Sequence, residues 1–249
     1  MPDTTIKTEI LIHDLKVPIS VIDAGAKSLL NRQSTYGPLT DKQTKVIKRI
    51  IRNTLTTQRL VNDMLELGRS REGVVNLSQF RVSALVIEVL VEIFDLANPP
   101  MAEMIRKTKS YEGLTKVLAS CGFYLAFDND TWSTEVCLDK AKVRQIVRNL
   151  ATNALKHRCE RVDILGLIED RSLRIKVRDD GPGIPASEHQ KIFNTYFTTG
   201  GSLDNAINSH GLGLAGVLVL LRDMGGDLSL DSELGKGAEF TVRIPVDQG

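Results

Sequence analysis

The N-terminal part of the chain carries two long stripes of apolar side chains at helical spacing, and these stripes restrict the folds open to it. A turn-rich break at residues 31–38 separates the stripes, and Thr40 or Asp41 is placed to cap the second helix. Two long amphipathic helices with a short connection form an antiparallel hairpin. One hairpin has too little core to stand alone. We therefore expect residues 1–72 to pair with a second copy as a four-helix bundle, in a homodimer.

The sequence pattern changes after residue 74, where short segments typical of β-strands alternate with segments typical of helices. We expect strands at residues 77–80, 122–127, 134–138, 161–169, 172–178, 227–231 and 238–244. We expect helices at residues 82–96, 140–158 and 211–223, a mixed helix-and-loop segment at 101–119, and a loop-rich zone at 179–210. Strands in pairs with helices between them indicate an α/β sandwich, in which a mostly antiparallel sheet is covered on one face.

Bulk composition is that of a soluble globular protein, with 42% hydrophobic and 25% charged residues. The formal net charge of +1 gives no overall attraction to nucleic acid or to an acidic membrane. Cys121, Cys137 and Cys159 lack metal-ligand spacing and cannot all pair, which favours reduced thiols in a cytoplasmic protein. No apolar run approaches the ~20 residues that span a bilayer. The N-terminal residues do not resemble a signal peptide.

Three polar residues share one face of the helix expected at 140–158. Asn149 and Asn153 are four residues apart, so both amides point the same way, and Lys156 lies one turn further on. Amide oxygens, waters and phosphate oxygens suit Mg²⁺, and a lysine can reach a phosphate as a point charge. A solvated helix face would have the same composition, so this segment alone leaves both readings open.

Two glycine-containing segments follow. Asp179, Gly181 and Gly183 come after a strand, where a carboxylate can accept a hydrogen bond from an amine such as that of adenine and glycines let the backbone approach a ring. An Asp-capped turn is the alternative. Gly211 and Gly213 precede an apolar helix, and a glycine-rich loop before a helix N-terminus is a phosphate site.

In this order, the motifs resemble those of the core of a two-component sensor histidine kinase. The second part is similar to the ATPase fold shared by histidine kinases, gyrase B, Hsp90 and MutL. The resemblance implies binding of ATP with Mg²⁺, the metal being held by Asn149 and Asn153. The implied nucleotide-binding residues form an Asn box (Asn149, Asn153, Lys156, His157), a first glycine box (Asp179, Gly181, Gly183) and a second glycine box (Gly211, Leu212, Gly213). Residues 192–197 resemble the Phe box, and residues 232–240 resemble the closing hairpin.

An isolated histidine such as His13 is commonly a surface or packed residue. Here His13, Asp14 and Pro18 resemble the family's His box, His-Asp-x-x-x-Pro, one hairpin upstream of the ATPase part. The resemblance implies that His13 attacks the γ-phosphorus as a neutral imidazole and that Asp14 favours the reactive tautomer. The phosphoryl group then passes to an aspartate in the receiver domain of a response regulator.

The sequence departs from the family pattern at several places. Val17 stands where many members carry Thr or Asn, which are thought to position water for dephosphorylating the regulator, so we expect weak or absent phosphatase activity. Ser209 replaces the first glycine of the second glycine box, and Asp180 stands where Asn is commoner. Residues 98–119 are longer than the family usually has here and form a docking or regulatory insertion or, as we favour, a surface elaboration.

The motifs predict a protein histidine kinase with a dimerisation and histidine phosphotransfer domain at 1–72 and an ATP-binding domain at 76–249. The chain would be cytoplasmic, or the cytosolic portion of a membrane-anchored sensor. Two alternatives stay open. One is an ATP-hydrolysing switch, which normally needs Glu where Asn149 stands; the other is a non-catalytic regulator of another kinase.

Overall fold

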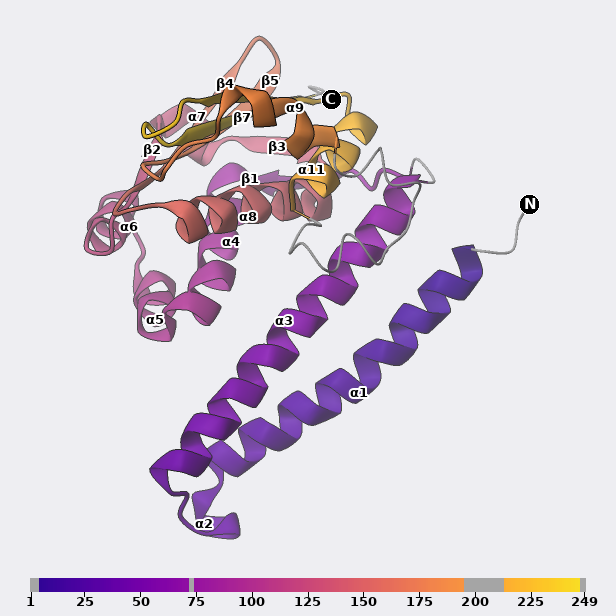
Figure 1. Cartoon of the computed structure of the whole chain (residues 1–249), viewed down its shortest axis with the longest axis vertical. Coiled ribbons are helices and arrows are strands. Elements are labelled where there is room, and N and C mark those ends of the chain that lie inside the picture. The colour runs from indigo at the N-terminus through magenta and orange to yellow at the C-terminus, as the bar shows by residue number, and fades with distance from the viewer. Residues whose placement is uncertain (1–4, 72–73, 195–212, 247–249) are drawn as a thin grey trace. The chain divides into compact units, whose positions relative to one another are not determined.

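The computed structural model describes residues 5–71, 74–194 and 213–246, and it divides the chain into two compact units, Met1–Glu72 and Gly73–Gly249 (Figure 1). Each unit is described by itself below. Within the described ranges, no helix is both long enough and apolar enough to cross a membrane.

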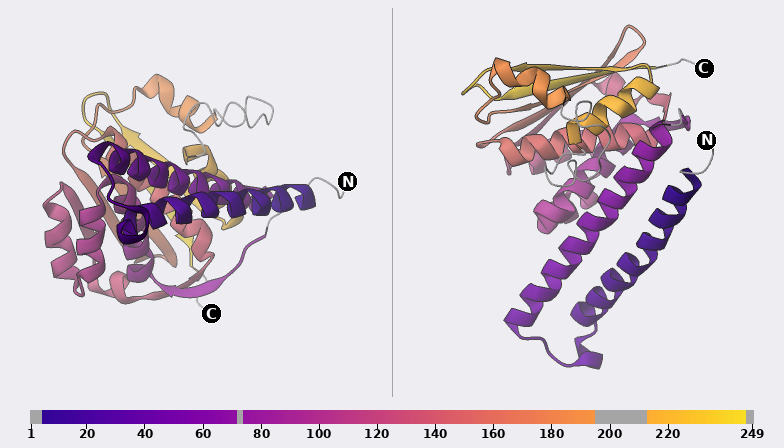
Figure 2. Two further views of the ribbon diagram at one scale, coloured as in Figure 1. Left: turned by 90° about the horizontal axis from the view of Figure 1, so that it is seen from below. Right: turned by 45° about the vertical axis from the view of Figure 1, so that its right-hand side comes forward.

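The first unit is an antiparallel helical hairpin, as the sequence predicts. Helices α1 (Thr5–Asn31) and α3 (Asp41–Arg71) lie side by side, and the short helix α2 (Gln33–Tyr36) occupies part of the connection (Figures 1 and 2). α1 continues through Pro18, so the proline does not end it. Thr40 starts α3 with a capping box: the Gln43 N–H donates to Thr40 Oγ1 (3.3 Å), and the Thr40 N–H donates to Gln43 Oε1 (2.9 Å).

The hairpin buries only a narrow stripe between its two helices. Ile19 and Ala26 of α1 and Ile47 and Val61 of α3 are buried. Many other large apolar side chains of the same helices are exposed: Leu15, Val17, Val21, Ile22, Leu29, Val46, Ile50 and Leu60. An exposed apolar surface of this extent is typical of a face that packs against another protein surface.

The second unit is built on a mixed sheet. Its strands are β2 (Phe123–Phe127), β4 (Val162–Glu169), β5 (Ser172–Asp179), β6 (Asp227–Ser232) and β7 (Ala238–Pro245). Their order in the sheet is β2-β4-β5-β7-β6, with β2 parallel to β4 and the remaining neighbours antiparallel. The β4–β5 and β6–β7 hairpins confirm the two that the sequence predicts.

Helices cover one face of this sheet (Figure 2). They include α4 (Val82–Ala97), α8 (Lys140–His157) and α11 (Gly213–Asp223). The alternation along β5 distinguishes the covered face of the sheet from the open one, because Ile175 and Val177 are buried while Arg178 is exposed. α8 is central, packing against α4, α11 and the sheet. The fold is the predicted α/β sandwich covered on one face.

Two of the expected strands lie outside the main sheet. β1 (Ser78–Arg81) and β3 (Glu135–Leu138) form a small antiparallel sheet of their own, so β3 is not a neighbour of β2. Between β2 and β3 lies the short helix α7 (Asn129–Ser133), capped by Asp128, whose side chain accepts from the Thr131 N–H. Cys121 and Cys137 therefore belong to different parts of the unit and are free thiols.

The region 98–119 is an integral part of the unit. It forms two helices, α5 (Pro99–Lys107) and α6 (Tyr111–Ala119), in place of the mixed segment expected from the sequence. Both contribute to the core through Met101, Ala102, Ile105, Leu114 and Leu118. In the zone expected to be loop-rich, residues 186–194 form helix α9 (Ala186–Asn194).

Two residues at the start of α8 anchor the first residues of the unit. Asp139 caps α8 by accepting from the Lys142 N–H (3.1 Å), and its other carboxylate oxygen accepts from the Asn76 N–H (2.9 Å). Buried Lys142 donates through Nζ to the Val74 carbonyl (2.7 Å) and pairs with Asp223 at the end of α11. Segment 74–76, α8 and the end of α11 are thus held together by polar contacts.

Candidate functional site

The predicted Asn box lies on the second half of α8. Asn149 and Asn153 are half-buried, whereas Lys156 and His157 in the last turn are exposed. The structure therefore places the two amides one turn apart on one helix, with the lysine beyond them toward the C-terminal end. This matches the predicted geometry for the helix itself.

Asp179 ends β5 and is 6% exposed. Its Oδ1 accepts a hydrogen bond from the Gly181 N–H at 2.9 Å. Burial raises the pKa of the Asp179 carboxyl, while the Gly181 N–H and the charge of nearby His157 oppose that shift. The same contacts bring the end of β5 to the end of α8, so the first glycine box and the Asn box meet at one corner of the unit.

Gly181 and Gly183 are required by contacts inside the protein. A Cβ on Gly181 would lie 2.3 Å from the His157 carbonyl oxygen, and one on Gly183 would lie 2.0 Å from the Glu233 carbonyl oxygen. Gly183 also has φ of +70°, a conformation that L side chains rarely adopt. The sequence argument that these glycines admit a ligand ring is therefore incomplete, because the backbone packing already demands them.

Asp180 has a role that the sequence does not reveal. Its Oδ1 accepts from the N–H groups of Cys159 (2.9 Å), Glu160 (3.1 Å) and Arg161 (2.9 Å), three successive residues of the turn between α8 and β4. The Arg161 N–H contributes most to lowering the pKa of the Asp180 carboxyl, and the N–H groups of Glu160 and Cys159 add to it. Asp180 thus fixes the turn that follows the Asn box.

The donor set at this corner suits a nucleotide with a hydrated divalent cation. Among the residues that the structure describes, no group of three or more His, Cys, Asp or Glu side chains could hold a metal. A cation here would be held by the amide oxygens of Asn149 and Asn153 together with oxygens of a bound phosphate and water, and Mg²⁺ takes oxygen ligands and keeps part of its hydration. The half-buried amides and the exposed Lys156 fit that chemistry.

The remaining predicted site residues are described only in part. Gly211 and Leu212 of the second glycine box, and Ser209, lie outside the described residues. Gly213 is the first residue of α11. His13 and Asp14 lie within α1, where Asp14 and Val17 are exposed. Of the Phe box, residues 192–194 end α9 and the rest falls outside the described ranges.

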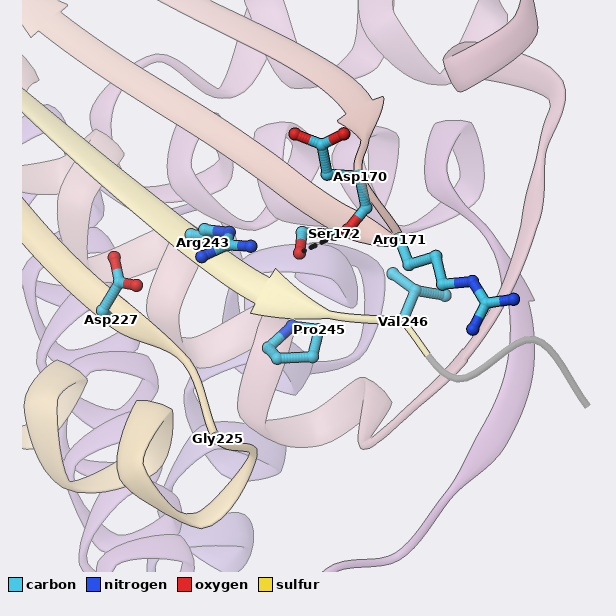
Figure 3. A pocket seen from close by; sticks show the side chains of 8 residues that line it. All are labelled: Asp170, Arg171, Ser172, Gly225, Asp227, Arg243, Pro245 and Val246. Atoms are coloured by element: carbon cyan, nitrogen blue, oxygen red, sulfur yellow. Dashed lines mark hydrogen bonds between the residues drawn. The ribbon is translucent and has the colours of Figure 1, made fainter.

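A pocket of about 340 Å³ lies at the opposite end of β5 (Figure 3). Its lining comes from the β4–β5 turn and from the adjoining ends of β6 and β7: Asp170, Arg171, Ser172, Gly225, Asp227, Arg243, Pro245 and Val246. The Ser172 hydroxyl donates to the Asp170 carbonyl at 3.4 Å. β5 runs from Ser172 to Asp179, so its whole length separates this pocket from the corner that contains the predicted site.

Two family models match the chain, one in each unit. Residues 9–73 match the His Kinase A (phospho-acceptor) domain, and residues 138–248 match the histidine kinase-, DNA gyrase B- and HSP90-like ATPase family. The matched ranges contain His13 in the first case and the α8–β5 corner in the second.

Similar curated proteins and solved structures agree with the two family models. The sensor histidine kinase RcsC of Escherichia coli (strain K12) is 32% identical over 202 residues, which cover 74% of this chain and 21% of that protein. The circadian input-output histidine kinase CikA of Synechococcus elongatus is 27% identical over 238 residues, covering 94% of this chain and 29% of that protein. Full-length ShkA in complex with AMPPNP superposes with a TM-score of 0.64 at 25% identity, covering 99% of this chain and 47% of that one. The chain thus spans between about a fifth and a third of the length of these two curated relatives.

Proposed function

The chain is the core of a histidine kinase, and from this premise we propose that it transfers the γ-phosphoryl group of ATP to His13 and then to an aspartate of a response regulator. The observation that carries the proposal is the corner where α8 meets β5. There the buried Asp179 carboxyl lies near His157, at the end of the helix that carries Asn149 and Asn153.

The nucleotide would lie along this corner. Asp179 is suited to accept a hydrogen bond from the adenine amino group, because it is buried and only one of its oxygens is bonded by Gly181. Lys156 would bind phosphate oxygens as a point charge. Asn149 and Asn153 would hold Mg²⁺, which when bound neutralises charge on the phosphates. The complex of ShkA with AMPPNP, an ATP analogue, supports nucleotide binding by this fold.

The first chemical step forms a bond between a ring nitrogen of His13 and the γ-phosphorus. The bond from that phosphorus to the oxygen bridging to the β-phosphate breaks, and ADP leaves. The ring must be neutral, because a protonated imidazole has no lone pair for the attack. Asp14, the next residue of α1, would accept the hydrogen bond or the proton of the other ring nitrogen. In the second step, a carboxylate oxygen of the regulator takes the phosphoryl group and the N–P bond breaks.

Dimerisation belongs to the same proposal. Residues 1–72 would form the dimerising and phosphoaccepting domain, and residues 76–249 the ATP-binding domain. The support is the exposed apolar surface of α1 and α3, which the hairpin leaves uncovered. Packing that surface against a second hairpin gives a four-helix bundle and removes the apolar area from water.

The observed side chains favour phosphotransfer over hydrolysis. An ATP-hydrolysing switch needs a carboxylate to take a proton from water, and Asn149 offers an amide at that place. A non-catalytic regulator would bind ATP without forming a phosphoprotein. The products of one labelling reaction separate the three functions.

The experiment incubates the chain with ATP labelled at the γ-phosphate and Mg²⁺, and follows labelled protein and free phosphate. We expect labelled protein that loses its label in acid and keeps it in base, as a phosphohistidine does. His13→Ala should abolish the label. The matched control is His189→Gln, which keeps a donor for the Ile184 carbonyl that His189 contacts at 2.9 Å and should be labelled normally.

Three results would contradict the proposal. If the His13→Ala variant keeps the label, another residue accepts the phosphoryl group. Steady release of phosphate without labelled protein would indicate the hydrolytic switch. ATP binding with neither product would indicate the non-catalytic regulator.

A further inference from the structure

Gln145 is a buried polar side chain with no partner among the described residues. It lies on α8 and is 3% exposed. Its carboxamide oxygen and nitrogen are both buried, and neither makes a hydrogen bond. A carboxamide has two N–H donors and an oxygen acceptor, so several hydrogen bonds are missing. Buried polar groups are nearly always paired in native proteins, and an exception needs a physical reason.

The place of Gln145 on α8 supplies that reason. Gln145, Asn149 and Asn153 follow one another at intervals of four residues, so they form one row along the helix. Lys142, one turn before Gln145, pairs with Asp223 of α11. The row therefore begins beside a polar contact to α11 and continues to the two amides assigned to the metal.

The row also has a direction relative to the nucleotide. His157, at the end of α8, lies against Gly181 and near Asp179, where the adenine would bind. Because a helix rises about 1.5 Å per residue, Gln145 stands about 18 Å along the axis from His157. Asn153 and Asn149 lie in between, so Gln145 is at the end of the row furthest from the adenine.

We propose that the Gln145 carboxamide binds the terminal phosphate of ATP and makes the site prefer ATP to ADP. Its two N–H donors suit phosphate oxygens. Without nucleotide the amide is unpaired and destabilises the folded chain; with ADP it stays unpaired; with ATP it gains its partner. Sites of this kind reject a ligand that lacks the bonding group, because a buried polar group is then left unsatisfied. This inference rests on the proposed function.

The test compares the full chain with Gln145→Met, which keeps the length and flexibility of the side chain and removes the amide. Calorimetry in the presence of Mg²⁺ measures binding of a non-hydrolysable ATP analogue and of ADP. We expect roughly tenfold weaker binding of the analogue, the size expected for loss of a hydrogen bond to a charged group, with little change for ADP. The midpoint of thermal unfolding without nucleotide should rise. Gln79→Met, the same change at an exposed position of β1, is the control and should alter none of these quantities.

The outcomes are distinct. If Gln145→Met keeps the ratio of the two affinities, the amide is satisfied by water or plays a packing role only, and the inference is wrong while the proposed function stands. If the unaltered chain binds neither nucleotide, the proposed function fails and this inference fails with it. Should Gln145→Met not fold, the side-chain N–H₂ signals of Gln145 in the unaltered chain decide. They should shift with the ATP analogue and stay in place with ADP, and equal shifts would overturn the inference.

Discussion

Asp179 and Asp180 are adjacent in the chain, yet their carboxyl groups have opposite electrostatic surroundings. Burial raises the pKa of Asp179, whereas backbone N–H donors, led by that of Arg161, lower the pKa of Asp180. Asp179 accepts a hydrogen bond from the Gly181 N–H, whereas Asp180 accepts from three successive residues of a turn. The first carboxyl is thus available to a ligand and the second is committed to the fold.

Asp180→Ala should lower the midpoint of thermal unfolding, because three N–H groups lose their acceptor. The pKa of Asp180 is lower in the folded chain, so its contribution is present above the unfolded pKa and is lost as the pH falls through the folded pKa. The difference from the unaltered chain should therefore be large at about pH 7 and small at about pH 3. Calorimetry at both values measures it, with Asp231→Ala as an exposed control. A difference independent of pH would rule out this role of the charge.

Asp179→Asn should have the opposite effect on stability and should weaken ATP binding. The folded chain holds the Asp179 proton more tightly, so ionising this group costs stability as the pH rises from the unfolded pKa to the folded pKa. The neutral amide avoids that cost, which predicts a higher melting temperature at about pH 7 and no gain at about pH 3. ATP affinity should fall because an amide is a weaker acceptor than a carboxylate. Unchanged stability at neutral pH would contradict the burial penalty.

Asp223→Asn should destabilise the chain by about 3–5 kcal/mol, the usual cost of breaking a buried ion pair. Lys142 is 1% exposed and Asp223 13%, so the substitution leaves a buried ammonium group that still donates to the Val74 carbonyl but has lost its carboxylate partner. Urea unfolding gives the free energy. The control is Glu112→Gln, which breaks the exposed pair with Lys116 and should cost about 0–1 kcal/mol. Equal losses in the two variants would show that burial does not decide the effect.

Val21→Glu should weaken dimerisation. Val21 is 66% exposed in the single hairpin, so a charge there should leave the hairpin folded and oppose burial of the apolar face in a dimer. Sedimentation equilibrium measures the dimer dissociation constant, and we expect it to rise at least tenfold. Lys48→Glu, at an exposed polar position of α3, is the control. A monomeric unaltered chain, or a Val21→Glu dimer of normal affinity, would contradict the proposed interface.

The chain should dephosphorylate its regulator slowly, and Val17→Thr should speed the reaction. Val17 is 55% exposed, and its side chain cannot hold a water molecule by a hydrogen bond. The assay mixes the chain and ADP with a phosphorylated regulator. Labelling of His13 by ATP should be similar in both forms, which shows that the kinase step is intact. Rapid dephosphorylation by the unaltered chain would refute the expectation.

Local signals predict many of the elements closely. The sequence predicts a helix over 140–158, and α8 spans Lys140–His157, because Asp139 caps one end and Lys156 and His157 favour the other. Residues 99 and 100 are prolines, which cannot continue a preceding helix but are favoured in the first turn of the next one. The Asn98 side chain accepts from the Met101 N–H and Pro99 starts α5, so the same residues that end α4 begin the next helix.

Non-local relationships had no such signal. The parallel pairing of β2 with β4, and of β1 with β3 in a separate sheet, depends on contacts between distant segments. The partners of Asp180 lie 19 to 21 residues away, so nothing beside it in the sequence reveals its role. Gln145 is different. Its four-residue spacing to Asn149 was visible, but only burial without a partner distinguishes it from other polar residues of α8.

The crowding at Gly181 and Gly183 has an evolutionary consequence. Each glycine is demanded by a carbonyl oxygen of the protein itself, so a descendant that stopped using ATP would still need both to keep its fold. Asn153 and Lys156 are not under that constraint, since both are at least partly exposed on α8. In a comparison of gene copies, loss of the asparagine or the lysine would therefore indicate that the copy has lost its catalytic activity. Intact glycines would indicate only that it has kept its fold.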